Sequence, residues 1–255
     1  VRNSVGVFDV SHMGEIFVRG QKALDFVQYI TINDASILTN GRVQYSAMCY
    51  PDGGIVDDLL AYKINDNEFM FVVNASNKDK DFEWMKKNNL FDVEIADESD
   101  DYSLLAVQGP NSKSVIEKLC DRPLDLEYYH FFFAKVSNVD MIVSRTGYTG
   151  ELGYELYFKG DEHTAEKVWN DLFEAGKEFN IQPAGLGARD SLRLEMGYCL
   201  YGNDIDETTN PLEANLGWIT KLKKNSFIGK DALLKIKEEG LNRKLVPLIS
   251  EEKAF

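Results

Sequence analysis

Apolar side chains recur along the chain with two different periods. The helical period, in which positions three and four residues apart share one face, occurs in three segments: 23–30, 112–119 and 161–179. Short runs rich in β-branched and aromatic residues, bounded by Gly, Asn and Asp, predict five strands: 59–64, 69–73, 104–108, 136–144 and 154–158. The turn-like residues 65–67 separate two of these runs, which predicts an antiparallel hairpin. Short strands that alternate with amphipathic helices predict an α+β fold.

Composition and charge narrow the classes of partner. The chain has 255 residues, of which 44% are hydrophobic and 27% charged, as in an ordinary globular protein. Its formal net charge of -14 opposes attraction to phosphate backbones, so we expect no nucleic-acid partner. No stretch approaches the roughly 18 apolar residues of a membrane helix, so we expect no membrane partner.

The cysteines and histidines give no pattern typical of a metal site. Cys49, Cys120 and Cys199 are odd in number and widely spaced, which favours buried, reduced thiols over disulfides or a zinc site. His12 has no second His or Cys nearby, and a structural hydrogen bond is its expected role. The sequence contains no nucleophile elbow, P-loop or zinc-peptidase motif, so we predict no metal and no chemistry of those classes.

Two adjacent carboxylates, Asp57 and Asp58, lie inside an apolar run after a turn at 51–54. Successive side chains of a strand point to opposite faces, so one of the two is expected on the core side of the sheet. A buried carboxylate needs a partner or a raised pKa, which makes it a functional candidate. A strand edge with two solvated acids fits the same pattern, and the spacing leaves both interpretations open.

A second candidate is Glu155, at the end of a segment with Gly147, Gly150 and Gly153. The three-residue spacing of the glycines predicts tight turns and close approach of the backbone to another group. It is not a dinucleotide fingerprint, because a strand follows where a helix is required. A carboxylate among apolar neighbours can accept paired N–H donors from a flat heterocycle. An exposed strand residue is the alternative.

A third candidate is Arg189, in a helix that we expect between Gly185 and Gly197. Arg189 and Arg193 are four residues apart and therefore share one face. A cation near the start of a helix is disfavoured by the helix dipole, and a carboxylate ligand would compensate that placement. The alternative is a surface Arg that pairs with a neighbouring acid such as Asp190.

Together these segments resemble the T-protein family of the glycine cleavage system. The family's motifs match Phe-Asp-Val-Ser-His-Met at 8–13, Gly-Gly-Ile-Val-Asp-Asp-Leu at 53–59, the glycine segment at 147–155, Ala-Arg-Asp-Ser-Leu-Arg-Leu-Glu at 188–195 and Leu-Tyr-Gly-Asn-Asp-Ile-Asp at 200–206. They occur in the family's order over essentially the whole chain, and the last two, so close together, are the most specific.

The resemblance implies antiparallel sheets with flanking helices around a central folate channel. Residues 1–16 and 117–219 would form a split folate-binding domain, residues 17–116 an inserted ferredoxin-like domain, and residues 220–255 a linker and the start of a C-terminal β domain. Members of the family carry further residues before and after the matched region, so we expect this chain to lack both ends.

The resemblance also implies a reaction and its residues. An aminomethyltransferase moves a methylene carbon from the lipoyl arm of H-protein to tetrahydrofolate, giving 5,10-methylenetetrahydrofolate and ammonia. The family's essential Asp matches Asp58, the acid that holds the pterin N–H groups matches Glu155, and a folate-binding Arg matches Arg189. Five positions match the lining of the folate pocket: Met13, Tyr45, Asn74, Tyr148 and Tyr198. Because Asp57 is expected to point away from this site, we expect Asp57→Asn to have little effect.

The implied partners are folate and the lipoylated H-protein, and the implied compartment is the cytoplasm of a bacterium or the mitochondrial matrix of a eukaryote. H-proteins of the family are usually acidic, so docking to this acidic chain needs a local basic patch. The candidates are Lys221, Lys223, Lys224 and Lys230.

Two other functions remain as alternatives. A non-catalytic folate-binding factor would carry a cysteine motif after the central region, where this chain has Lys-Asn-Ser-Phe-Ile-Gly-Lys at 224–230. Another folate-dependent one-carbon enzyme, such as a demethylase or a dehydrogenase-associated folate domain, shares part of the pattern.

Overall fold

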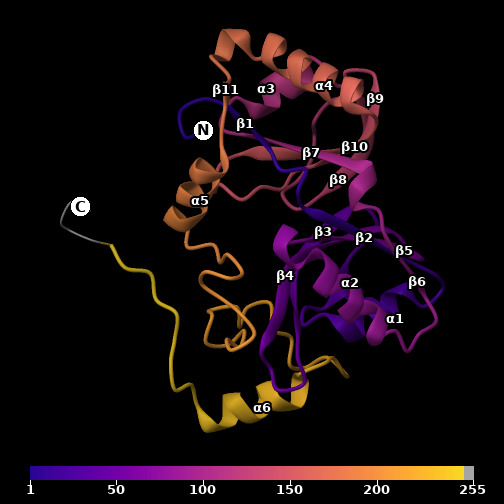
Figure 1. Cartoon of the computed structure of the whole chain (residues 1–255), viewed down its shortest axis with the longest axis vertical. Coiled ribbons are helices and arrows are strands. Elements are labelled where there is room, and N and C mark those ends of the chain that lie inside the picture. Colours follow the sequence, from indigo (N-terminus) through magenta and orange to yellow (C-terminus); the bar gives the residue numbers. More distant parts are fainter. Residues whose placement is uncertain (250–255) are drawn as a thin grey trace.

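The computed structural model describes residues 1–249 and contains two β-sheets packed face to face, with helices on both outer faces (Figure 1). The helices α1 (Ala23–Ile30) and α2 (Lys78–Lys87) form one outer layer. The helices α3 (Ser112–Glu117) and α4 (Glu162–Ala175) form the other. The space between the sheets is a third hydrophobic core, to which both contribute aromatic side chains.

The first sheet has six strands, in the order β11 (Gln182–Pro183), β1 (Gly6–Asp9), β7 (Tyr102–Gln108), β10 (Gly153–Lys159), β9 (Val139–Ser144) and β8 (Phe131–Val136). All neighbours are antiparallel except β1 and β11, which are parallel. The sheet therefore joins the start of the chain to its middle.

The second sheet has five antiparallel strands, in the order β3 (Arg42–Cys49), β4 (Ile55–Asn65), β5 (Glu68–Val73), β2 (Gly14–Arg19) and β6 (Glu94–Asp97). Without the edge strand β3, the chain order is strand, helix, two strands, helix, strand. This order and the antiparallel pairing are those of a ferredoxin-like unit, the type of unit that the family resemblance implies.

β4 is buried on both faces of the second sheet, which explains why its sequence is almost continuously apolar. Leu59 and Ala61 pack on the side of α1 and α2. Leu60 and Tyr62 point to the first sheet, as the two-residue period of a strand requires. Polar residues in the first part of this strand, at 55–63, are therefore enclosed by protein.

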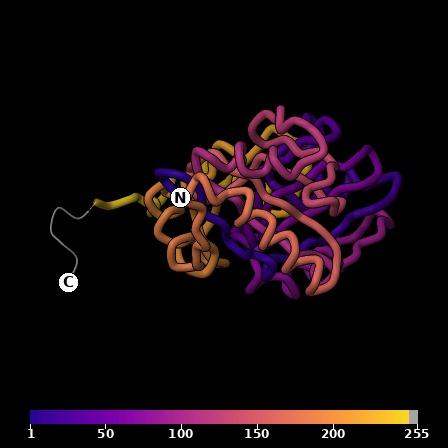
Figure 2. The backbone as a smooth tube through the Cα atoms, turned by 90° about the horizontal axis from the view of Figure 1, so that it is seen from above, coloured from indigo at the N-terminus to yellow at the C-terminus, as the bar shows by residue number. Residues whose placement is uncertain are grey.

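The start of the chain and the segment after α5 both pack against other parts of the molecule. The N-terminal residues lie beside the orange segment that contains α5 (Leu186–Glu195), as Figure 2 shows, and the Arg2 guanidinium donates to Glu195 and to the Leu192 carbonyl. Residues 199–233 pack against β3 and the start of β4 and lead into α6 (Lys230–Glu239).

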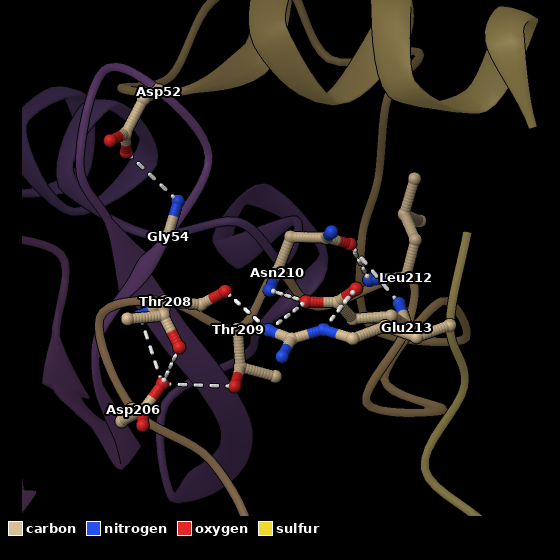
Figure 3. A network of polar contacts seen from close by, with 9 residues as sticks. Asp52, Gly54, Asp206, Thr208, Thr209, Asn210, Leu212 and Glu213 are labelled. Atoms are coloured by element: carbon tan, nitrogen blue, oxygen red, sulfur yellow. Dashed lines mark hydrogen bonds and ion pairs between the residues drawn. The ribbon is translucent and has the colours of Figure 1, made fainter. Parts of the chain in front are cut away.

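A polar loop at 206–213 fastens this C-terminal segment to the start of β4 (Figure 3). The Asp206 carboxylate accepts hydrogen bonds from Thr208 and Thr209, and the Thr209 carbonyl accepts the N–H of Ile55 at 2.9 Å. Glu213 closes the loop, accepting from the Asn210 N–H at 2.9 Å. The loop therefore fixes the strand just before Asp57 and Asp58.

Gly54 is required where this loop crosses the β3–β4 turn. A Cβ at Gly54 would lie 2.0 Å from the Glu207 carbonyl oxygen, so either backbone would have to move. We expect Gly54→Ala to lower the free energy of unfolding by about 1–3 kcal/mol, measured by urea titration. Gly217→Ala is the control, because its Cβ would meet only Leu212 at 3.8 Å. Equal losses in the two variants would contradict this role for Gly54.

Most of the elements expected from periodicity are present, and one strand was wrong. The predicted strand 136–144 contains the whole of β9 but only the last residue of β8, with a turn at Ser137 and Asn138 between them. Both residues have positive φ, 54° and 62°, which is the geometry of a two-residue hairpin turn. The predicted helix 161–179 ends at Ala175, and a separate 3₁₀ turn follows Gly176.

The sheets divide the chain slightly earlier than expected. Residues 1–9 and 102–183 hold the strands of the first sheet, and residues 14–97 hold those of the second. The boundaries expected at 16/17 and 116/117 fall inside β2 and α3. The division into domains stays a prediction. The end of the third expected segment, residues 250–255, lies outside the described residues.

Candidate functional site

Asp58 is held between two hydrogen-bond donors on the face of β4 that points to the first sheet. Its carboxylate accepts from the Tyr45 hydroxyl at 2.8 Å and from Asn74 Nδ2 at 2.9 Å. The residue is only 9% exposed. Burial and the neighbouring charge of Asp57 raise the pKa of Asp58 to about 7, while the two hydrogen bonds lower it. A carboxyl group with such a pKa exchanges protons readily near neutrality.

Asp57 lies on the opposite face of β4, as alternation predicts, but it is not independent of Asp58. Its carboxylate is 0% exposed and accepts from Asn77 Nδ2 at 2.7 Å and from Asn74 Nδ2 at 2.9 Å. The same Asn74 amide also reaches Asp58. The alternative of two solvated acids is therefore wrong, because β4 is covered on both faces. The expectation that Asp57→Asn has little effect also has to be revised.

Three further candidates form a second group. The rings of Tyr148 and Tyr198 stack with their centroids 5.9 Å apart, and the Arg189 guanidinium lies 4.8 Å from the Tyr148 centroid. The Tyr148 hydroxyl donates to the Cys199 carbonyl. Burial and then the charge of Asp58 raise the pKa of Tyr148, which places this group within electrostatic reach of Asp58. The structure thus gathers aromatic faces, a cation and a carboxyl group.

The two arginines of α5 differ in their partners. Arg193 is 3% exposed and forms ion pairs with Asp190 and Asp204. Within residues 1–249, no carboxylate lies within ion-pair distance of Arg189. The alternative of an Arg paired with a neighbouring acid thus applies to Arg193, and Arg189 keeps its charge available for a ligand.

Glu155 faces the space between the sheets rather than solvent. It is buried, and its carboxylate accepts from the hydroxyls of Thr146 and Tyr157. Tyr157 in turn bonds the hydroxyl of Tyr62 on β4 at 2.9 Å. The alternative of an exposed strand residue is therefore wrong. Glu155 and Asp58 belong to the facing surfaces of the two sheets.

One predicted lining residue and one residue that the sequence analysis missed remain to be placed. Met13, a predicted residue, is half-buried beside the core between the sheets. Trp218 was missed. Its ring lies 6.0 Å from the ring of Tyr45, yet it remains 63% exposed. The sequence carries no signal for it, because single exposed hydrophobic residues are normal on protein surfaces.

The expected basic patch is only partly available for docking. Lys224 is buried and donates to the carbonyls of Thr31 and Asn33, and burial lowers its pKa to about 7. The Lys230 ammonium donates to backbone carbonyls of the same turn. Lys221 and Lys223 are exposed. The four lysines therefore do not form one surface, because two of them stabilise the segment that carries them.

Two classes of site find no basis in the described part of the chain. Over residues 1–249, no three His, Cys, Asp or Glu side chains gather as metal ligands would. Over the same residues, no helix is both long enough and apolar enough to cross a membrane. Two surface depressions, beside α4 and beside Arg145, contain none of the candidate residues.

Comparison with known proteins decides the family. The model of the GCVT N-terminal domain matches residues 1–224. The chain belongs to the GCVT family. An aminomethyltransferase of Halothermothrix orenii is 57% identical over 96% of this chain and 69% of its own length. One of Flavobacterium psychrophilum is 53% identical over 100% of this chain and 70% of its own length.

A solved structure agrees with the GCVT assignment. The glycine cleavage system aminomethyltransferase T of Bartonella henselae superimposes with a TM-score of 0.86 at 34% identity. The match covers 94% of this chain and 64% of the other. The chain thus spans about two thirds of the length of these GCVT relatives. The predicted α+β fold with antiparallel sheets is confirmed.

Proposed function

We propose that the full-length protein is an aminomethyltransferase of the glycine cleavage system, with tetrahydrofolate as the acceptor of the one-carbon unit. The observation that carries this proposal is Asp58, a buried carboxyl group with a pKa of about 7 that binds the Tyr45 hydroxyl and whose charge raises the pKa of Tyr148. Its relatives in the GCVT family carry the name aminomethyltransferase, and nothing in the structure favours a non-catalytic folate-binding factor or a different one-carbon enzyme.

The chemistry requires protons to move from the folate nitrogens to the departing amine and to the lipoyl sulfur. The methylene carbon leaves an aminomethyl group on the lipoyl sulfur and forms bonds to N5 and N10 of tetrahydrofolate. Its bonds to the amine nitrogen and to sulfur break. The two protons of N5 and N10 leave with ammonia and the lipoyl thiol. Asp58 is the group suited to take up and release such a proton near neutral pH, with Tyr45 and Asn74 holding its carboxylate in place.

The other candidates would bind and orient folate. Glu155 would accept N–H donors of the pterin, a charge-assisted contact. Arg189 would pair with a carboxylate of the glutamate tail, which compensates its position on α5. Tyr148 and Tyr198 offer flat apolar surface for the rings, and Trp218 extends that surface beside Tyr45. Met13 would complete the lining.

A binding measurement tests the folate part of the proposal. Glu155→Gln replaces an acceptor of two N–H groups by an amide with one acceptor, and we expect it to weaken tetrahydrofolate binding roughly 10- to 100-fold. Calorimetry on the full-length protein gives the dissociation constant. Glu166→Gln, on the exposed face of α4, is the control. Unchanged affinity in Glu155→Gln would remove this residue from the site.

The proposed donor is the lipoylated H-protein, and the proposed compartment is the cytoplasm, because the relatives compared here come from bacteria. Lys221 and Lys223 are the lysines of the expected patch that a partner can reach. Since Lys224 and Lys230 serve the fold, they are not proposed as contacts of H-protein.

A further inference from the structure

A second buried carboxyl group lies behind the site. Asp81 belongs to α2, which covers the face of the second sheet to which Asp57 points. It is 0% exposed, and both of its carboxyl oxygens are shielded from solvent. Within residues 1–249, neither oxygen accepts a hydrogen bond from any N–H or O–H group. A carboxylate in such a place would be severely destabilised.

The buried position of Asp81 is no longer destabilising if Asp81 carries a proton, because a protonated carboxyl group can donate a hydrogen bond to Asp57. Two carboxyl groups that touch cannot both be ionised, and the one with fewer donors takes the proton. Asp57 has three N–H donors, from Asn77 Nδ2 and from the backbone and side chain of Asn74. Burial and the charge of Asp57 raise the pKa of Asp81 far above its usual range. The Asp81 hydroxyl is then free to donate to Asp57.

Within residues 1–249, no cation pairs with the Asp81 carboxyl group, although the nearby charge of Lys80 acts to lower its pKa. The Lys80 ammonium donates to the Val56 carbonyl at 2.6 Å and lies 4.0 Å from the Tyr201 centroid. The other titratable groups near the pair are the phenols of Tyr50 and Tyr201, whose pKa values are raised, chiefly by burial. Near Asp58 itself the titratable groups are Tyr45, Tyr148 and Cys199, and each has a raised pKa and is neutral at pH 7.

We propose that Asp81 is a positioning residue of the site, and this inference rests on the proposed function. It holds a proton and donates it in a hydrogen bond to Asp57, which keeps Asp57 an ionised acceptor for Asn74. The chain of contacts runs from Asp81 through Asp57 and Asn74 to Asp58. Asp81 thereby fixes the amide that holds Asp58 and maintains the negative charge beside it.

Replacement of Asp81 should shift the pH profile of methylene transfer in one direction only. The charge of Asp57 raises the pKa of Asp58. In Asp81→Leu, Asp57 loses a hydrogen-bond donor that stabilises its charge, so this charge acts less strongly on Asp58 and the pKa of Asp58 falls. The acid limb of kcat/KM for methylene transfer should move to lower pH by about one unit. In Asp81→Asn the amide still donates to Asp57, so the limb should stay near that of the wild type.

A limb that does not move in Asp81→Leu, or that moves equally in both variants, would overturn the inference. Thermal unfolding of each full-length variant shows whether it folds. A merely structural role for Asp81 would lower the unfolding temperature without shifting the limb.

Infrared spectroscopy provides a readout that does not need activity. Just above the pKa of Asp58, Asp81 should still be protonated, so the wild type should show a protonated-carboxyl C=O band that Asp81→Asn lacks. Absence of this difference would overturn the inference. If the band is present but the wild type transfers no methylene group, the proton on Asp81 stands and the proposed function fails.

Discussion

Asp58→Asn in the full-length protein is expected to slow methylene transfer about 10²- to 10⁴-fold, the usual contribution of a positioned acid or base. The amide has nearly the same shape and its oxygen still accepts from the Tyr45 hydroxyl. It has no proton to exchange near pH 7, whereas Asp58 has a pKa of about 7. Single-turnover formation of 5,10-methylenetetrahydrofolate measures the effect, and tetrahydrofolate affinity should change far less than the rate.

The control for this variant is Asp140→Asn, on the exposed part of β9. It makes the same chemical change away from the site and should leave the rate unaltered. Asp57→Asn should fall between the two, because Asp57 holds Asn74 but does not face the first sheet. A rate for Asp58→Asn within a few-fold of the wild type would refute the role of Asp58 as proton carrier.

Arg193→Leu is expected to lower the free energy of unfolding by about 2–4 kcal/mol, somewhat less than for a fully buried ion pair. Arg193 donates to Asp190 at 2.8 Å, to Asp204 and to the Tyr198 carbonyl at 3.0 Å, so its loss removes a donor from each of three acceptors, of which Asp204 keeps the N–H of Leu200. The two carboxylates are partly exposed, and water recovers part of the loss. Urea titration of the full-length protein measures the change.

The matched control is Arg189→Leu, one turn earlier on the same helix. Arg189 has no ion pair in the described residues, so its removal should change stability little. Tetrahydrofolate affinity should respond strongly in Arg189→Leu, because the free charge is proposed to bind a ligand carboxylate. If both variants lost the same stability and kept the same affinity, the assignment of separate roles to the two arginines would be wrong.

Sequence periodicity predicted elements whose packing is regular. The helix at 23–30 buries the four residues that its spacing assigns to one face: Ala23, Phe26, Val27 and Ile30. The prediction of a single strand at 136–144 was wrong, because the pattern of apolar residues gives no information on the positive φ of Ser137 and Asn138. α2 was missed, since its sequence is dominated by charge and buries only Asp81 and Met85 fully.

The candidate site was predictable where a polar residue stands out against apolar neighbours. Asp58 and Glu155 were predicted as candidates for this reason, and both are buried between the sheets. The contact of Asp57 with Asp81 was not predictable, because it depends on how α2 packs on the second sheet. The same holds for Trp218 beside Tyr45, which are brought together only when residues 199–233 cover β3.

The most direct test of the proposed function is to supply the full-length protein with tetrahydrofolate and aminomethyl-loaded H-protein and to measure 5,10-methylenetetrahydrofolate. We expect product from the wild type, released with ammonia, and almost none from Asp58→Asn. Tetrahydrofolate binding without product from the wild type would contradict the assignment of aminomethyl transfer, although the fold and the folate site would remain.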